Sequence, residues 1–133
     1  MINPFVKGDK KFYSKVVTQE ETATFESGEV HPFYGTFALG RDAEWVCRLF
    51  VLEMKEEGEE GIGTYLNIKH LAPALVGDEI ELTGILDAVD GRHVHCLFEA
   101  RSKGKLIAQG STGQYILSEK RKKELYKDIG HGG

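Results

Sequence analysis

One stretch of the sequence follows the repeat of an α-helix, and most of the chain after it follows the repeat of a β-strand. The helical stretch carries apolar residues at i, i+3, i+4, i+7, i+8 and i+11, namely Ala43, Val46, Cys47, Phe50, Val51 and Met54. Thr36 can act as the N-cap of this helix, and a glutamate-rich run over residues 56–60, broken by Gly58 and followed by Gly61, ends it. A single helix cannot bury its apolar face alone, so the rest of the chain has to supply the opposing layer.

The segments after Gly61 alternate apolar and polar residues with a period of two, as half-buried strands do. The apolar positions are Leu66 and Ile68, then Ile80 and Leu82, then Val94, Cys96, Phe98 and Ala100, and finally Leu106 and Ala108, whose strand runs on to Ile116. Asp90-Gly91 predicts a two-residue hairpin and Lys103-Gly104 a second turn, so the last strands form an antiparallel meander.

Ahead of the helix, Phe12 to Thr18 is predicted to be a first strand, and the polar segment Gln19 to Val30 a loop or loosely structured arm. One helix and about five strands that share one core predict an α+β fold, in which a curved antiparallel sheet wraps around one long central helix. This is the hot-dog architecture. The open edges of such a sheet invite pairing with a second copy, so we expect a homodimer.

Length and composition exclude several classes of protein. The 133 residues fit a single domain, residues 1–133, with a core over about 10–118 and a charged tail over 119–133. No apolar run approaches the roughly 18 residues of a membrane-spanning helix, and the N-terminus lacks the features of a signal peptide. A net charge of −4 gives no bulk attraction for nucleic acid or anionic membranes. Cys47 and Cys96 lie in apolar patterns without Cys-x-x-Cys spacing, which favours buried reduced thiols and a cytoplasmic location.

Three residues could carry chemistry. Glu44 lies at the margin of the apolar helix face, where partial removal from water suits a base or a nucleophile, although a glutamate that reaches solvent is the simpler interpretation. His70 ends a strand on the same face as Leu66 and Ile68, where it could act as a general base or be a satisfied core histidine. Thr36 places a hydroxyl near the helix N-terminus, where free amides favour negative charge.

Other polar residues are weaker candidates. Gly35 and Gly63 would let the backbone approach a ligand closely. His93 and His95 share one strand face, but no third ligand stands at a suitable spacing, so we expect an outer-face pair and no metal site. We expect the glutamate run after the helix to be a solvated loop, and His131 to lie in a disordered terminus.

The sequence resembles a known family over about Val16 to Leu117. The matching motifs are Gly63-Thr64, Ile68-Lys69-His70-Leu71-Ala72-Pro73, Val76-Gly77-Asp78 and Val89-Asp90-Gly91-Arg92. They are similar to those of hot-dog thioesterases related to fluoroacetyl-CoA thioesterase. In that family a threonine, a helix glutamate and a strand-end histidine form the catalytic set, and Thr36, Glu44 and His70 fall on those positions at the family's spacing.

The chain departs from the family pattern in its last strand. The family usually has Gly-Thr-His-x-Arg there, whereas this chain has Gly110-Ser111-Thr112-Gly113-Gln114. Gln114 thus occupies the arginine position, and together with Gly35 and Gly63 it is our candidate for contact with substrate. Arg41 and Asp42 also stand where family members tend to be apolar.

The resemblance implies an acyl-CoA thioesterase that needs no cofactor, since coenzyme A is part of its substrate. It does not specify the acyl group, and a covalent intermediate on Glu44 and direct attack by water are both open. Two alternatives remain. One is a hydratase or dehydratase of enoyl thioesters, for which Asp42 is the only helix aspartate available. The other is a non-catalytic module that binds acyl-CoA or another small ligand.

Overall fold

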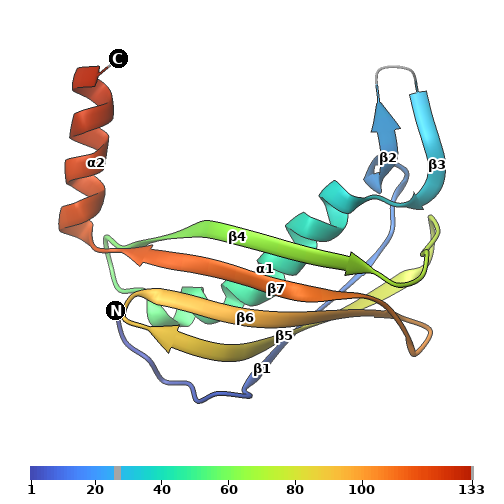
Figure 1. The fold of residues 1–133 in the computed structure, drawn as a ribbon, viewed down its shortest axis with the longest axis horizontal. Helices are drawn as coiled ribbons and strands as arrows, with labels where there is room; N and C mark the ends of the chain where they lie inside the picture. Colours follow the sequence, from blue (N-terminus) through green and yellow to red (C-terminus); the bar gives the residue numbers. More distant parts are fainter. Residues whose placement is uncertain (26–27, 133) are drawn as a thin grey trace.

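The computed structural model describes residues 1–25 and 28–132, and most of them belong to one sheet and one long helix (Figure 1). The elements in chain order are β1 (Lys10–Val16), a 3-10 turn (Gln19–Glu21), β2 (Thr22–Phe25), β3 (Gly28–Tyr34), α1 (Thr36–Met54), β4 (Glu60–His70), β5 (Glu79–Asp90), β6 (His93–Ser102), β7 (Lys105–Leu117) and α2 (Glu119–Gly132). The five-stranded sheet has the order β1-β5-β6-β7-β4, and every neighbouring pair is antiparallel.

The core lies between α1 and one face of this sheet, as the two hydrophobic periods predict. All six apolar positions of the helical repeat are fully buried. Ile80, Leu82, Val94 and Phe98 are buried opposite them. Burial of this kind contributes roughly 1.5–3 kcal/mol for each large side chain, which makes it the main term that holds the helix on the sheet.

Strand β4 is an edge of the sheet, and a bulge in it controls which side chains face the helix. Gly63 pairs with Gln114 of β7, and the next pair along the strand joins Tyr65 to Gly113. Thr64 is therefore the extra residue of the bulge. A residue added in this way resets the alternation of a strand. Gly63 before the bulge and Leu66 after it therefore both face α1, although simple alternation would place them on opposite sides.

Leu66 and Ile68 face the helix as predicted, but they are less buried than the other strand positions. Leu66 retains 39% of its exposed surface and Ile68 is half-buried. Both approach Gly40 of α1. Their exposure follows from the position of β4, because it is the last strand of the sheet in the described part of the chain.

The structure corrects the prediction of a loop over Gln19 to Val30. The described part of this segment forms the 3-10 turn, β2 and the start of β3, and β2 and β3 pair as an antiparallel hairpin that projects beside the start of α1 (Figure 1). The hairpin forms a separate two-stranded sheet outside the main core, so its strands lack the apolar alternation from which strands were predicted.

Two other segments, the charged tail and the first hairpin turn, also differ from their predictions. The charged tail is helical and forms α2, so His131 lies in a helix rather than in a disordered terminus (Figure 1). The first hairpin turn consists of Gly91 and Arg92, one residue later than predicted, because Asp90 already pairs with His93. The second turn is Lys103-Gly104 as predicted, and both residues adopt the positive φ that such a turn needs.

The glutamate run after α1 is not entirely solvated, because Glu59 is buried. Its carboxylate accepts a hydrogen bond from Arg92 at 2.7 Å, forms an ion pair with the amino group of Met1 at 2.8 Å and accepts from the Glu56 amide. Burial alone would raise the pKa of Glu59, but these donors outweigh it and hold the pKa at about 2.

In the described part of the chain, no helix is long and apolar enough to cross a membrane.

Candidate functional site

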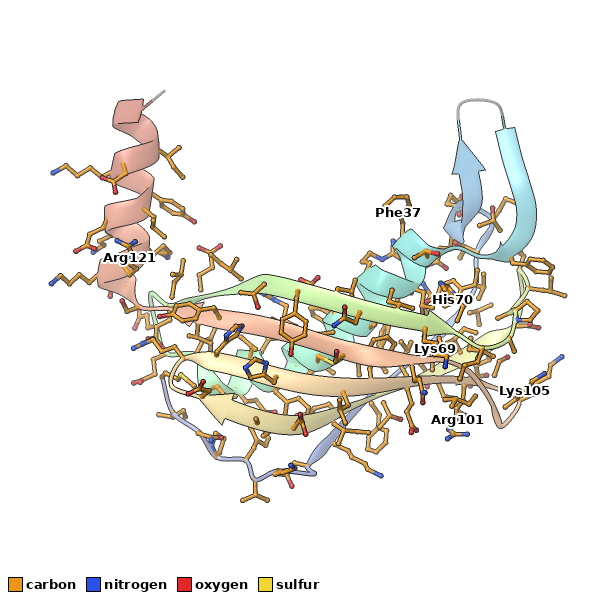
Figure 2. All side chains as sticks on the ribbon, viewed as in Figure 1. Phe37, Lys69, His70, Arg101, Lys105 and Arg121 are labelled. Carbon is orange, nitrogen blue, oxygen red and sulfur yellow. The ribbon has the colours of Figure 1, made fainter. Side chains whose placement is uncertain are left out.

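Thr36 and His70 meet at the N-terminal end of α1. The Thr36 Oγ1 and His70 Nε2 atoms share a hydrogen bond of 3.0 Å, although 34 residues separate them in the chain. Figure 2 shows His70 at the end of β4, and Phe37 projecting away from the sheet from the first turn of the helix. The contact needs the bulge in β4, since the bulge keeps His70 on the helix side of the strand.

A cavity of about 390 Å³ opens beside this pair. Gly35, Thr36 and His70 supply its polar edge, and the remaining wall is mostly apolar, with Phe33, Tyr34, Leu39, Leu71, Ala72, Pro73, Ala74 and Ile107. An apolar pocket with a few convergent polar groups is the usual form of a small-molecule site.

The start of α1 differs from the prediction in a way that frees the Thr36 hydroxyl. The N-cap is Gly35, in an extended conformation, and Thr36 is the first helical residue. The first main-chain bond of the helix runs from the Leu39 amide to the Gly35 carbonyl at 3.0 Å, so the amides of residues 36–38 have no acceptor within the helix. They point toward the end of the helix where negative charge is favoured.

Glu44 lines a second cavity of about 390 Å³, whose wall includes Thr36, Phe37, Gly40, Arg41, Leu66 and Ile68. Thr36 therefore belongs to both cavities, whereas His70 lines the first and Glu44 the second. Within the described part of the chain, the Glu44 carboxylate has no hydrogen-bond partner. It is half-buried against β4 at Gly63, where an added Cβ would lie only 2.9 Å from its Oε1 atom.

Gln114 lies under the helix and lines neither of the two cavities. Only 1% of its surface is exposed, and its Nε2 donates to the main-chain carbonyl of Glu44 at 3.4 Å. Its Oε1 atom has no hydrogen-bond partner among the described residues. The structure therefore connects Gln114 with the backbone of Glu44. Gly35 lines the first cavity, whereas Gly63 lies against the Glu44 carboxylate and lines neither cavity.

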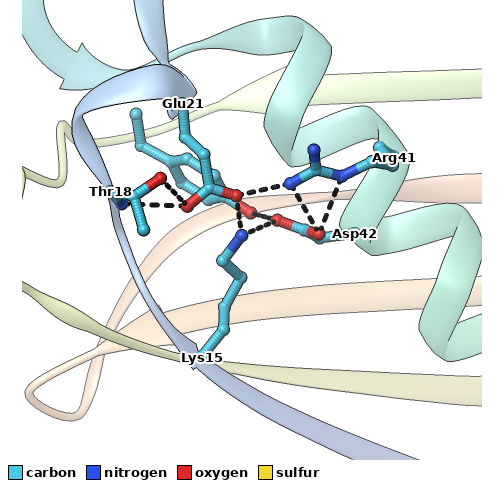
Figure 3. Close-up of polar contacts among 6 residues, drawn as sticks. Lys15, Thr18, Glu21, Arg41 and Asp42 are labelled. Carbon is cyan, nitrogen blue, oxygen red and sulfur yellow. Dashed lines mark hydrogen bonds and ion pairs between the residues drawn. The ribbon is translucent and has the colours of Figure 1, made fainter.

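Arg41 and Asp42, which depart from the family pattern, belong to a polar network between α1 and the segment before it (Figure 3). Asp42 is buried, lies 2.9 Å from the Lys15 Nζ atom and accepts a hydrogen bond from the Tyr34 hydroxyl. Glu21, also buried, pairs with Lys15 and with Arg41. Burial and the hydrogen bond to Asp42 raise the pKa of Tyr34, so its phenol stays protonated. The network ties β1, the β2–β3 hairpin and α1 together.

Periodicity did not identify two neighbours of the candidate residues. Phe37 is 91% exposed, which is unusual for a large apolar side chain at the mouth of a cavity. Arg48 lies one helical turn after Glu44 and donates from Nη1 to the Gly61 carbonyl at 3.0 Å. The spacing of four residues from Glu44 is the one signal in the sequence that could have indicated Arg48.

The fold is shared with solved structures of hot-dog proteins. A Thermus thermophilus protein described as a thioesterase superfamily member is 35% identical over 98% of this chain and 96% of its own, with a TM-score of 0.91. A variant of the fluoroacetyl-CoA-specific thioesterase FlK is 20% identical over 94% and 97%, with a TM-score of 0.83. A hot-dog-like protein from Thermanaerovibrio acidaminovorans is 23% identical over 92% of both chains, with a TM-score of 0.81. These similarities confirm the α+β hot-dog fold and define a protein of the thioesterase superfamily.

The family itself follows from the sequence match. The model of the fluoroacetyl-CoA-specific thioesterase family matches residues 17–120, a range that includes Thr36, Glu44, His70 and Gln114. The chain belongs to this family, and the resemblance found in the sequence motifs is confirmed. A comparison with curated proteins finds no match.

Proposed function

We propose that this protein is an acyl-CoA thioesterase, which hydrolyses a thioester to a carboxylate and free CoA with Thr36, Glu44 and His70. Family membership supports the reaction class. The observation that carries the residue assignment is the Thr36–His70 hydrogen bond at the helix N-terminus, on a threonine that also borders the Glu44 cavity. Structures of FlK variants with fluoroacetate and CoA, and with acetyl-CoA, support an acyl-CoA as the substrate.

The free amides at the start of α1 suit the charge that develops during the reaction. When the thioester carbonyl carbon is attacked, its oxygen becomes an oxyanion, and donors already oriented toward that oxygen lower the barrier. The amides of residues 36–38 offer such donors because the helix uses none of them. The apolar wall with Leu39, Ala72 and Ile107 would then hold the acyl group.

Glu44 would act as the nucleophile or as the base that activates water, and both routes give the same products. In the direct route water adds to the carbonyl carbon, Glu44 accepts its proton, and the C–S bond breaks. In the covalent route the carboxylate attacks the carbonyl carbon, the C–S bond breaks to release the thiolate, and water then opens the resulting anhydride to the free acid and the carboxylate of Glu44. His70, held by Thr36, would deliver a proton to the departing thiolate in either case. Neither route needs a cofactor.

A panel of acyl-CoA substrates assayed for thiol release tests this proposal. We expect Glu44→Ala and His70→Ala to lose at least about a hundredfold in rate, in the range typical of acid–base residues. Glu53→Ala is a matched control, because Glu53 is an exposed glutamate on the same helix paired with Lys11. Full activity of Glu44→Ala, or an equal loss in Glu53→Ala, would refute the assignment of Glu44.

The two alternative functions give different results in the same experiment. Hydration of an enoyl-CoA releases no thiol, so an enoyl hydratase would consume substrate without free CoA. The aspartate of α1, Asp42, is buried in the network with Lys15 and Tyr34 and lines neither cavity, which argues against a hydratase. A binding module would bind acyl-CoA without turnover, so neither the parent nor Glu44→Ala would release thiol.

We also propose that the protein is a cytoplasmic homodimer. The long strand β4 is a free edge of the sheet, and Leu66 and the 91% exposed Phe37 lie near it. An open edge of this kind is a template for pairing with a second copy. Sedimentation velocity should give twice the chain mass, and a monomer at micromolar concentration would contradict the dimer. Both cysteines are free and buried, which supports a reducing compartment.

A further inference from the structure

Two histidines stand side by side on the face of the sheet opposite α1. His93 and His95 alternate along β6 with Val94 and Cys96, which are buried against the helix. The ring centroids of the two histidines are 4.4 Å apart, and their planes make an angle of 40°. Both rings are half-buried, and Tyr115 on the neighbouring strand contacts His93 edge-on at 6.0 Å.

The bulge in β4 brings a hydroxyl to each of these histidines. Thr64 Oγ1 lies 2.6 Å from His93 Nε2, and the Tyr65 hydroxyl lies 2.7 Å from His95 Nδ1. Consecutive residues of a regular strand point to opposite faces, so only the bulge lets Thr64 and Tyr65 serve the same face. Gly113 leaves the space for this arrangement, since an added Cβ there would lie 2.1 Å from the Tyr65 ring.

Each imidazole thus has one nitrogen held by a hydroxyl and one nitrogen left over. In the described part of the chain, His93 Nδ1 and His95 Nε2 have no hydrogen-bond partner. A histidine that binds a metal commonly donates its other ring N–H to a neighbouring oxygen, which fixes the tautomer and the orientation of the ring. Thr64 and Tyr65 supply those oxygens, so the free nitrogens can present their lone pairs.

We propose that His93 and His95, oriented by Thr64 and Tyr65, form a binding site for a late first-row divalent metal ion on the outer face of the sheet. Imidazole nitrogen suits Cu²⁺, Ni²⁺ and Zn²⁺, whereas Mg²⁺ and Ca²⁺ prefer oxygen ligands. Two protein ligands leave the remaining coordination positions to water or to an incoming group. No group of three or more His, Cys, Asp or Glu side chains able to hold a metal occurs among the described residues, and the site is a two-histidine chelate. It is separate from the proposed hydrolytic residues.

Titration of the untagged, metal-free protein with Cu²⁺ tests this proposal by calorimetry and electron paramagnetic resonance. A His131→Gln background removes the histidine in the glycine-rich end, and His70→Gln serves as a matched control for a histidine at the other site. We expect one Cu²⁺ per chain with two nitrogen ligands, which His70→Gln retains. The double variant His93→Gln/His95→Gln should lose this binding.

Tyr65→Phe separates the orienting hydroxyl from the ligands. We expect it to weaken Cu²⁺ binding about 10- to 100-fold while the two-nitrogen spectrum persists, as for other residues that support a metal ligand. Metal-free His93→Gln/His95→Gln should release thiol from acyl-CoA at the rate of the parent. Unchanged Cu²⁺ affinity in the double variant, or no saturable binding by the parent, would overturn the proposal, and neither result bears on hydrolysis.

Discussion

Gly63→Ala should move the Glu44 carboxylate without unfolding the protein. An ideal Cβ at residue 63 would lie 2.9 Å from Glu44 Oε1 and 3.4 Å from its Cδ, whereas ordinary van der Waals contact begins at 3.4 Å. The oxygen therefore has to retreat by about 0.5 Å, which a flexible side chain can do at little cost. The backbone itself accepts alanine, because Gly63 does not have a positive φ.

The displacement allows the size of the effect to be estimated. Catalytic groups have to be held within about 0.5 Å of their productive positions, and a displacement of about 1 Å can cost about a hundredfold in rate. A retreat of half that size should therefore lower kcat about tenfold, or about 1.4 kcal/mol in the activation barrier. The free energy of unfolding should change by less than about 1 kcal/mol, because the smaller conformational freedom of alanine in the unfolded chain offsets the crowding.

Thiol release and urea unfolding, measured on the same preparations, test this prediction. Thr64→Ala is the matched control, since the neighbouring side chain lies on the opposite face and its removal leaves the contact between Gly63 and Glu44 intact. Wild-type kcat in Gly63→Ala would show that the position of the carboxylate does not limit hydrolysis. A loss of several kcal/mol in stability would show that the substitution disturbs the strand and not only the carboxylate.

Three further predictions concern stability and the Thr36 hydroxyl. Lys15→Met should lower the free energy of unfolding by about 3 kcal/mol, since two buried carboxylates lose their shared cation. Lys11→Met removes an exposed ion pair and should lower the free energy of unfolding by less than about 1 kcal/mol. If urea unfolding gave equal losses for Lys15→Met and Lys11→Met, the burial of the Lys15 pairs would not explain their effect. Thr36→Val should reduce kcat/KM about 10- to 100-fold, the effect expected when a hydrogen bond to a charged group is lost. Thr36→Ser keeps the hydroxyl and should lose much less. Equal rates in the two variants would show that the hydroxyl takes no part in hydrolysis. The folded pKa of Glu59 is about 2, below its ordinary 4.5, so its carboxylate stabilises the fold above about pH 4.5 and this contribution is lost as the pH falls toward 2. The stability difference between the parent and Glu59→Gln should shrink over that interval in urea unfolding, and a constant difference would be inconsistent with the ion pairs of Glu59.

The hydrophobic periods predicted the fold because the core depends on them directly. The face from Ala43 to Met54 and the positions of Ile80 and Phe98 are buried as the patterns indicate. The contact between Thr36 and His70 could not be derived in this way. It joins residues 34 positions apart, and only the resemblance to a family placed them in one site.

Periodicity failed where polar residues are buried or a strand is irregular. Glu21 lies in a polar segment that predicts a loop, yet it is buried because Lys15 and Arg41 neutralise it. The bulge at Thr64 and Tyr65 has no clear signal in the alternation, because alternation only assigns each residue to a face and does not reveal an extra one.

The extra residue in β4 also limits how this strand can change. Removing one residue between positions 63 and 66 would restore simple alternation, and it would turn either Gly63 or every later position, His70 included, to the other side of the sheet. A substitution here alters one contact. A deletion would break two contacts together, the one between His70 and Thr36 and the one between Tyr65 and His95. The spacing along this strand should therefore tolerate changes of side chain far better than changes of length.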